Sequence, residues 1–347
     1  MRARAVLVSL LVVVAAMVSA QPVQATIYVS MEGQVVATWE DDANGDVAPT
    51  TTITGASTNL NTPYGIDVDS NYIYVANQSR QGITVYPIDG NGDLAPVRQI
   101  SGSSTRLSGV EGIAVDGNWI YVTSSNRIVV FPLDADGDVA PAREISGTTT
   151  TLSSPRKIDV DGDWIYVADP GDNSIKSFPI DAAGNVPPAR TIVGASTLLS
   201  GHYALAVGSG WIYATSYGIA GAPPYNVLVF PNDASGDVAP TRRIEGAATT
   251  LNQPYGIEVD SDWIYVANYN AQSVVVFPID ADGDVPPART IAGPSTPFDE
   301  WPSGIAVSAP QVSASGIPAM SPWGGMMLIL LIGFGAIWLM RRTAVAA

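Results

Sequence analysis

The sequence predicts an all-β fold, a six-bladed β-propeller with four-stranded blades. Two observations lead to this prediction: a motif that recurs six times, and short β-type runs whose numbers fit a closed ring. The motif reads Gly-Asp-Val-Ala-Pro at residues 45–49. Close copies follow at 92–96, 137–141, 184–188, 236–240 and 283–287, at intervals of 47, 45, 47, 52 and 47 residues. A period in the forties built from short strands is typical of propeller blades.

Each repeat contains four runs that are rich in β-branched and aromatic residues. In one repeat they read Gly-Ile-Glu-Val (256–259), Trp-Ile-Tyr-Val (263–266), Val-Val-Val-Phe-Pro (274–278) and Arg-Thr-Ile (289–291). Gly, Asp, Asn or Pro bound every run, and this composition favours strands. No stretch shows helical periodicity, so we expect four strands per blade and no helix in this domain.

The two inner runs test whether the ring closes. The first run and the second run each occur six times, yet the domain begins with a second run (27–29) and ends with a first run (304–307). These two halves add up to one blade. We therefore predict a propeller over residues 26–309 that is closed by strands from its N- and C-terminal ends, which leaves no open sheet edge.

The repeats resemble NHL repeats. Residues 112–122, Gly-Ile-Ala-Val-Asp-Gly-Asn-Trp-Ile-Tyr-Val, and residues 266–277, Val-Ala-Asn-Tyr-Asn-Ala-Gln-Ser-Val-Val-Val-Phe, carry the likeness. The resemblance implies a propeller across the whole domain. It implies little about function, because such propellers bind proteins, sugars or RNA, and some act as enzymes.

The N-terminus has the features of a secretory signal peptide. A basic start (Met-Arg-Ala-Arg) precedes an apolar run at 5–18 and small residues at 18–20. We expect residues 1–20 to be removed by signal peptidase, so the protein is exported. A retained membrane anchor is the alternative, although the apolar run is short for a membrane span. The chain has no Cys, so no disulfides stabilise the exported domain.

A second apolar segment, residues 323–340, precedes Arg341 and Arg342. Its length just suffices for a transmembrane helix, and the arginines predict that the C-terminus lies inside and the domain outside. Residues 310–316 form the expected linker between the propeller and this region.

Residues 317–324 resemble the IPTL-CTERM sorting signal, an Ile-Pro-Thr-Leu-Ser-x-Trp-Gly motif followed by an apolar helix and a basic end. The matching residues are Ile317, Pro318, Ser321, Trp323 and Gly324, whereas Ala319 and Met320 replace Thr and Leu. The resemblance implies that an exosortase-type enzyme recognises residues 317–347, removes the helix and delivers the protein to the cell surface or exterior of a Gram-negative bacterium. A plain membrane anchor is the alternative.

The charge of the domain excludes some partners. Four of the 16 basic residues (Arg2, Arg4, Arg341 and Arg342) lie in the terminal segments, so the region between them carries 12 basic and 32 acidic residues, a net of −20. This field repels nucleic acid and anionic lipid, and it attracts cations.

The repeated motif contains a cluster of acidic residues. Residues 134–138 (Asp-Ala-Asp-Gly-Asp) resemble the start of a calcium loop, but the twelfth position, where such a loop needs Glu, is Ile145. We favour a hairpin turn between the third and fourth strands, in which Asp-Gly supplies the positive φ.

A second set of acids lies on the innermost strand. The third position of the first run reads Asp67, Ala114, Asp159, Ala206, Glu258 and Ala306 around the ring. Three carboxylates near one axis raise each other's pKa or recruit a cation, for which calcium is the natural choice. The predicted metal site is Asp67, Asp159 and Glu258. Alternatively, the gene grew by duplication of a two-blade unit, and the acids form hydrogen bonds between blades.

The loops before the first strand and after the second are expected on one face, around the channel mouth. The fourth blade has an insertion here, at residues 218–224. Exposed aromatics and insertions concentrate where ligands bind, although ordinary loop variation is the alternative. The candidate ligand-binding residues are Tyr64, Arg156, His202, Tyr203, Tyr217, Tyr225, Tyr255, Asn268, Tyr269 and Trp301.

The sequence lacks a catalytic constellation. His202 is the single His, and no Gly-x-Ser-x-Gly elbow accompanies it. We expect a surface-sorted, non-catalytic binding or scaffold propeller with a protein or polysaccharide ligand. The alternatives are a calcium-dependent hydrolase or lactonase-like enzyme with its site in the channel, and an architectural surface protein. We also expect the Trp of the second run to pack between blades and the Arg that begins the fourth run to guard a solvent-facing edge.

Overall fold

The computed structural model describes residues 25–216 and 224–308, and of residues 202 and 203 it describes the backbone alone. The expected signal peptide, linker and sorting segment (1–20, 310–316 and 317–347) lie outside the described residues. Within the described ranges, no helix is long and apolar enough to cross a membrane.

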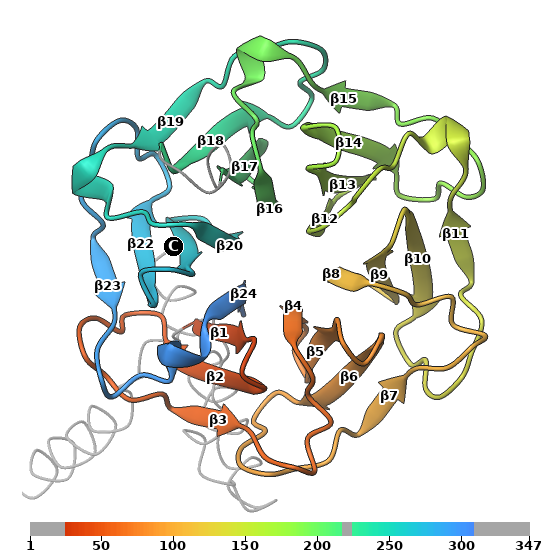
Figure 1. Cartoon of the computed structure of the whole chain (residues 1–347), viewed down its shortest axis with the longest axis horizontal. Coiled ribbons are helices and arrows are strands. Elements are labelled where there is room, and N and C mark those ends of the chain that lie inside the picture. The colour runs from red at the N-terminus through yellow and green to blue at the C-terminus, as the bar shows by residue number, and fades with distance from the viewer. Residues whose placement is uncertain (1–24, 217–223, 309–347) are drawn as a thin grey trace, which may run out of the picture. The chain divides into compact units, whose positions relative to one another are not determined.

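Six antiparallel four-stranded sheets stand around a common axis, as the sequence predicted (Figure 1). We call the region along this axis the channel. We number them in chain order. Blade 1 comprises β4 (Pro63–Val68), β5 (Tyr72–Asn77), β6 (Gly82–Pro87) and β7 (Arg98–Ile100), and blade 2 comprises β8 (Val110–Asp116), β9 (Trp119–Ser124), β10 (Arg127–Pro132) and β11 (Arg143–Ile145). Blade 3 comprises β12 (Ile158–Asp161), β13 (Trp164–Asp169), β14 (Ser174–Pro179) and β15 (Arg190–Ile192), and blade 4 comprises β16 (His202–Gly208), β17 (Trp211–Ser216), β18 (Asn226–Pro231) and β19 (Arg242–Glu245). Blade 5 comprises β20 (Pro254–Val259), β21 (Trp263–Asn268), β22 (Ser273–Pro278) and β23 (Arg289–Ile291), and blade 6 comprises β24 (Pro302–Val307), β1 (Thr26–Met31), β2 (Val35–Glu40) and β3 (Thr51–Ile53).

Short helical turns connect four pairs of blades, where no helix was expected. These 3₁₀ helices are η1 (Thr148–Thr150), η2 (Ala195–Thr197), η3 (Ala247–Thr249) and η4 (Phe298–Glu300). Each is a single turn, which is too short to leave a periodic pattern in the sequence.

The two ends of the domain close the ring in blade 6. Strand β24 pairs with β1, with Val307 opposite Ile27 and Ile305 opposite Val29. The predicted closure is therefore confirmed. Strand β24 is the innermost strand of blade 6, so this blade has four strands like the other five (Figure 1). In the closed ring every blade has a neighbouring blade on both sides.

Successive side chains of a strand pack against different neighbouring blades. Val75 of β5 packs in one core cluster with Tyr28 of blade 6. The preceding residue, Tyr74, packs in another with Val122 of blade 2. Successive side chains of a strand point to opposite faces, so each blade contributes to two cores. Full burial of one such apolar side chain contributes roughly 1.5–3 kcal/mol.

The innermost strands approach one another closely, and this explains the glycine that opens the first run. A Cβ added to Gly304 would lie 2.6 Å from Oγ of Ser30 and closer still to the carbonyl oxygen of Tyr64, whereas real Cβ atoms essentially never come within 3.0 Å of such atoms. Blades 3 and 4 carry Lys157 and Ala204 at this position instead.

The repeated acidic motif between the third and fourth strands, at residues 89–93 in blade 1, joins each blade to the preceding one. Oδ1 of Asp93 in blade 1 accepts a hydrogen bond from the backbone N–H of Ser57 at 2.7 Å, and Oδ1 of Asn91 accepts one from Thr52 at 3.0 Å. The glycine between them pairs with the outer strand of the preceding blade, and the same bridge recurs around the ring as Gly45–Ile291, Ile53–Gly92, Ile100–Gly137, Ile145–Gly184, Ile192–Gly236 and Ile244–Gly283. The motif lies between the third and fourth strands and its glycine has positive φ, as expected, but residues 88–97 form a ten-residue loop and not a tight hairpin turn. The polar side chains of this loop accept hydrogen bonds from the neighbouring backbone.

The arginines that begin the outer strands connect blades, which corrects their expected role as edge guards. The guanidinium of Arg143 lies 5.2 Å from the ring centre of Trp119, and its Nη1 donates to the carbonyl oxygen of Ile180 in blade 3 at 2.6 Å. Arg190 stacks on Trp164 at 3.9 Å. The tryptophans thus pack at the blade boundaries, as expected, each beneath an arginine.

Candidate functional site

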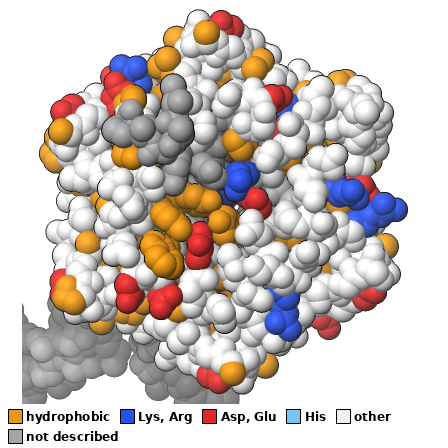
Figure 2. All heavy atoms as spheres, viewed as in Figure 1, with side chains coloured by type: hydrophobic (Ala, Val, Ile, Leu, Met, Phe, Trp, Pro, Cys, Tyr) orange, Lys and Arg blue, Asp and Glu red, His pale blue; other side chains and the backbone are white. Residues whose placement is uncertain are grey.

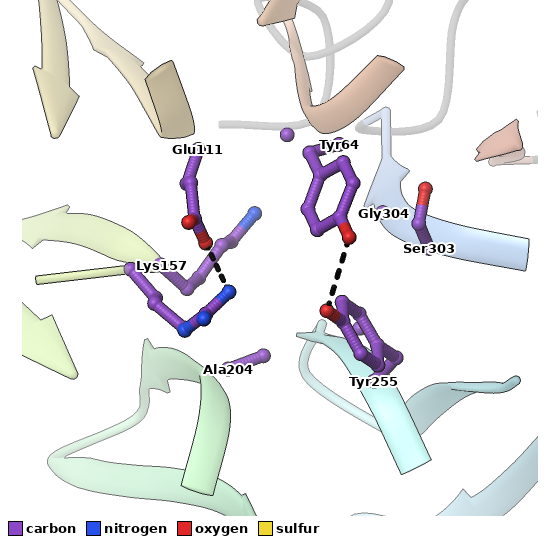
Figure 3. A pocket seen from close by; sticks show the side chains of 10 residues that line it. Tyr64, Glu111, Lys157, Ala204, Tyr255, Ser303 and Gly304 are labelled. Atoms are coloured by element: carbon purple, nitrogen blue, oxygen red, sulfur yellow. Dashed lines mark hydrogen bonds and ion pairs between the residues drawn. The ribbon is translucent and has the colours of Figure 1, made fainter. Parts of the chain in front are cut away.

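The loops before the first strand and after the second meet at one end of the channel, which we call the mouth. The side chains around it come from blades 1 to 6, and Figure 3 shows Tyr64 and Tyr255 on one side and Glu111 and Lys157 on the other. The sequence placed these loops on a common face, and the structure brings most of their described side chains together there.

Four aromatic rings form a continuous series on one side of the mouth. Tyr64 meets Tyr255 edge-on, with ring centres 5.7 Å apart. Tyr255 and Tyr269 follow at 5.1 Å, and Tyr269 and Trp301 are nearly parallel at 6.5 Å. We call these four residues the aromatic row. Tyr64 and Tyr255 lie near the start of β4 and β20, Tyr269 follows β21, and Trp301 precedes β24. Three different blades therefore contribute to the row.

A carboxylate that the sequence analysis missed lies beside the aromatic row. Oε2 of Glu32 accepts a hydrogen bond from the Tyr269 hydroxyl at 3.3 Å, and its backbone N–H donates to the carbonyl oxygen of Trp301 at 3.2 Å. Burial, with a smaller contribution from the charge of Glu32, raises the pKa of Tyr64 to about 12. Glu32 follows the second strand of blade 6, just as Tyr269 follows that of blade 5, so aligning the stitched blade with the others would have revealed it.

The outer end of the aromatic row is open to solvent. Trp301 is 47% exposed, which is unusual for so large an apolar side chain. Figure 2 shows hydrophobic side chains gathered beside the central opening over β20 and β24, with acidic side chains close by. The row is therefore a surface that a ligand can reach.

The opposite side of the mouth is charged. Nη1 of Arg156 forms an ion pair with Oε2 of Glu111, and Gln78 donates to the other carboxylate oxygen at 3.4 Å. Burial raises the pKa of Glu111, while Arg156 lowers it. Arg156 was predicted as a ligand-binding residue, and it lines the mouth, where it is held by Glu111. Figure 3 shows Glu111 across from Tyr64 and Tyr255.

The hollow between these two sides is small. It measures about 30 Å³ and is lined by Tyr64, Glu111, Lys157, Tyr255 and Gly304 among others. This volume accommodates a few water molecules, whereas pockets for small ligands typically measure roughly 300–1,000 Å³. A ligand of this face therefore lies on its surface.

The acids of the innermost strands link the blades in pairs. Oδ1 of Asp67 accepts from the N–H of Val68 at 2.7 Å, and Oδ2 accepts from Val115 in blade 2 at 2.6 Å. Asp159 repeats this contact between blades 3 and 4, where its Oδ2 accepts from Val207 at 2.6 Å. The alternation of acid and alanine thus corresponds to hydrogen bonds between blades.

Glu258, the third of these acids, has a different contact. Its longer side chain accepts a hydrogen bond from the N–H of Val259 in its own strand, at 3.1 Å. We call Asp67, Asp159 and Glu258 the channel carboxyls. All three residues are partly buried.

The channel carboxyls interact electrostatically. Burial raises the pKa of Asp67 to about 6 and that of Asp159 to about 7, while the positive charge of Lys157 lowers both. Burial and the charge of Asp159 together raise the pKa of Glu258 to about 8. Lys157, at the strand position where four blades have glycine, therefore supplies the channel with a counter-charge.

The channel carboxyls were predicted to hold a metal ion. Within the part of the chain that the structure describes, no group of three or more His, Cys, Asp or Glu side chains is arranged to ligate one ion. Both oxygens of Asp67 already accept backbone hydrogen bonds, so the geometry favours the alternative of contacts between blades.

The remaining predicted ligand-binding residues divide into two groups. Asn268 is fully buried, and its side chain bonds to the backbone of Asn252 at 2.7 Å and of Thr250 at 2.9 Å, so it supports a loop and does not reach a ligand. Tyr225 is partly buried against the core between blades 4 and 5. The side chains of His202 and Tyr203, and all of Tyr217, lie outside the described residues.

The fold is similar to those of several solved structures. A chain of a nidogen/laminin complex matches with a TM-score of 0.60 and 17% identity, over 83% of this chain and 99% of that chain. A protein of unknown function from Desulfotomaculum acetoxidans matches with a TM-score of 0.54 and 16% identity, over 85% and 91%. A provisionally assigned 6-phosphogluconolactonase from Bacteroides uniformis matches with a TM-score of 0.55 and 17% identity, over 81% and 84%.

Sequence comparison adds no relative to these structures. No protein-family model and no curated protein matches the chain. At the low identities of the structural matches, their likeness shows the six-bladed propeller fold alone.

Proposed function

We propose that this protein is an exported, surface-sorted propeller that binds a protein or polysaccharide partner through the aromatic row and catalyses no reaction. The observation that carries the proposal is the row itself. Its four rings follow one another beside the channel mouth, with 5.1 to 6.5 Å between the centres of successive rings, and Trp301 at its end is 47% exposed. Exposed aromatic side chains of this kind supply much of the binding energy at interfaces.

The proposed location rests on the two ends of the sequence. Cleavage by signal peptidase after Ala20 releases the N-terminus, and the apolar segment 323–340 holds the chain in the membrane until an exosortase-type enzyme acts. The motif at 317–324 and the arginine pair at 341–342 support sorting to the cell surface. The nidogen/laminin match supports a binding role, since a similar fold occurs there within a protein complex.

An enzyme is the second candidate function, because the raised pKa values of the channel carboxyls are of a kind often found at active sites. One structural match is also a provisionally assigned lactonase. Against a channel site stand the hollow of about 30 Å³ and the use of the carboxylate oxygens of Asp67 and Asp159 by backbone donors.

Chelation distinguishes these two functions. We expect EDTA to leave the melting temperature unchanged, because Lys157 and backbone N–H groups already balance the channel carboxyls. Differential scanning calorimetry with EDTA, and with EDTA followed by excess calcium, measures this. A fall of many degrees that calcium reverses would establish a structural ion and favour the calcium-dependent enzyme.

Photo-crosslinking in native cells tests the binding function. A benzophenone residue at Asn270, which is exposed beside Tyr269, is expected to capture a discrete partner. The same residue at exposed Ser70, in the turn between β4 and β5 at the far end of the channel, is expected to capture none. Intact-mass analysis of the same samples reads the C-terminus, which ends before Trp323 if sorting removes the helix. Equal adducts from both sites, or none from Asn270, would refute the binding surface, and a retained C-terminus would refute processing.

A further inference from the structure

We infer that the partner of the aromatic row is a basic polypeptide segment, whose arginine or lysine side chain lies against Trp301 and Tyr269 with its charge beside Glu32. This inference rests on the proposed binding function and selects one class among its ligands. Three observations support it: the backbone of Trp301, the charges around the row, and the way the fold itself uses arginine and tryptophan.

The backbone conformation of Trp301 indicates a role outside the fold. The residue before the first strand has positive φ in five blades, and these residues are Thr62 (52°), Gly109 (59°), Gly201 (53°), Gln253 (56°) and Trp301 (57°). Glycine adopts this conformation without strain, whereas a bulky aromatic residue is an outlier there. Trp301 is 47% exposed, so the fold buries only about half of this residue in return for the strain. Strained residues of this kind cluster where proteins bind ligands.

Negative charge surrounds the exposed end of the row. The carboxylate of Glu32 accepts a hydrogen bond from the Tyr269 hydroxyl, and the backbone N–H of Glu32 donates to the carbonyl oxygen of Trp301. A second carboxylate, that of Glu300, lies against the backbone of Gly33, the residue that follows Glu32. A Cβ added to Gly33 would overlap the Glu300 carboxylate. Two basic side chains, Arg156 and Lys157, also line the mouth. Arg156 is paired with Glu111, and the charge of Lys157 acts on the channel carboxyls.

This arrangement favours a cation and repels an anion. The electron-rich face of an aromatic ring attracts a guanidinium or ammonium group, and adjacent carboxylates strengthen that attraction. The net charge of −20 between the terminal segments adds a long-range field of the same sign. An uncharged sugar would gain stacking from the rings but nothing from this field, and an acidic polysaccharide would be repelled.

The fold contains an internal precedent for this contact. Arg289 lies 4.4 Å from the ring centre of Trp263, and Arg190 lies 3.9 Å from that of Trp164. At these blade boundaries the chain supplies both partners. At Trp301 it supplies the ring and the acids, and a partner would supply the cation.

Isothermal titration of the full chain in detergent tests the inference with four probes. They are the capped peptide Gly-Arg-Gly-Arg-Gly, the same peptide with Glu in place of Arg, cellohexaose, and alginate. We expect the arginine peptide to bind most tightly, with an affinity that falls as salt is added. Trp301→Gly and Glu32→Gln are each expected to weaken its binding at least tenfold.

Two matched variants separate binding from folding. Gln253→Gly makes the same backbone change before β20 and Glu40→Gln removes a carboxylate at the far end of β2, so both are expected to bind the arginine peptide like the wild type. Trp301→Gly is expected to keep or raise the melting temperature, because it relieves the strained backbone. Equal affinity for the arginine and glutamate peptides, or wild-type affinity in Trp301→Gly, would overturn the inference. Binding of cellohexaose or alginate that Trp301→Gly abolishes would also overturn it, while the proposed binding function would stand.

Discussion

Replacement of Gly304 by alanine is expected to lower the free energy of unfolding by about 3 kcal/mol, the upper end of what overpacking costs. The added methyl group would lie 2.6 Å from Oγ of Ser30 and closer still to the carbonyl oxygen of Tyr64. The carbonyl is backbone, so it can retreat only if β24 and β4 separate. These strands join blade 6 to blade 1, and the change therefore weakens the closure of the whole ring.

Thermal and urea unfolding, followed by circular dichroism, measure this effect, and we expect a melting temperature lower by at least about 5 °C. Ala204→Gly is the matched control, because Ala204 has the corresponding position in β16 and already carries the methyl group. Its cost is expected to stay near 1 kcal/mol, the usual penalty of a glycine in a strand. Equal stability of Gly304→Ala and the wild type would show that the inner strands are less tightly packed than the structure indicates.

Replacement of Glu258 by glutamine is expected to stabilise the protein at pH 8. Burial and the charge of Asp159 raise the pKa of Glu258 to about 8. A carboxyl whose pKa is raised on folding stabilises the folded state fully below its unfolded pKa, near 4.5, and this contribution is lost as the pH rises to the folded value. Glutamine is neutral at every pH, so the Glu258→Gln variant does not lose this stability as the pH rises. We expect a gain on the order of 2 kcal/mol after discounting for water in the channel.

Urea unfolding at pH 4.5, 6 and 8 tests this expectation. The wild type is expected to lose stability across this range, and Glu258→Gln to lose less. Asp67→Asn provides the contrast, because the carboxylate of Asp67 accepts hydrogen bonds from both Val68 and Val115, and an amide NH₂ group would face one of these donors. That variant is expected to be less stable than the wild type at every pH. A loss of stability at pH 8 in Glu258→Gln would contradict the repulsion between the channel carboxyls.

The repeats made the architecture predictable from the sequence. Each blade repeats the same local signals, so the count of inner runs settled the number of blades and the stitching of 27–29 to 304–307. One of the two explanations that the sequence offers for the acid–alanine alternation, a hydrogen bond from one blade to the next, agrees with the contacts of Asp67 and Asp159. Repetition supplied this information, since a pattern seen six times separates structural positions from variable ones.

Features that depend on one contact between distant residues were less accessible. Arg143 was expected at a solvent-facing edge because a strand pattern does not show that its guanidinium reaches Ile180 of the next blade. The sequence predicts Asn268 as a ligand-binding residue, although polar residues end the second strand in most blades and thus mark a structural position. The sequence does not reveal Glu32 as a residue of the mouth, because its blade is divided between the two ends of the sequence.

The stitched blade has a consequence for when the protein becomes competent to bind. The N–H of Gly304 donates to Oγ of Ser30, 274 positions earlier in the chain. Until the ribosome has made β24, blade 6 has only three strands, and Trp301 has not yet met Glu32. Contacts so distant in sequence form late, after the entropy of closing a very long loop has been overcome. On the proposed export route, in which the chain crosses a membrane N-terminus first, the aromatic row would therefore be complete only after translocation, and no cytoplasmic molecule would occupy it beforehand.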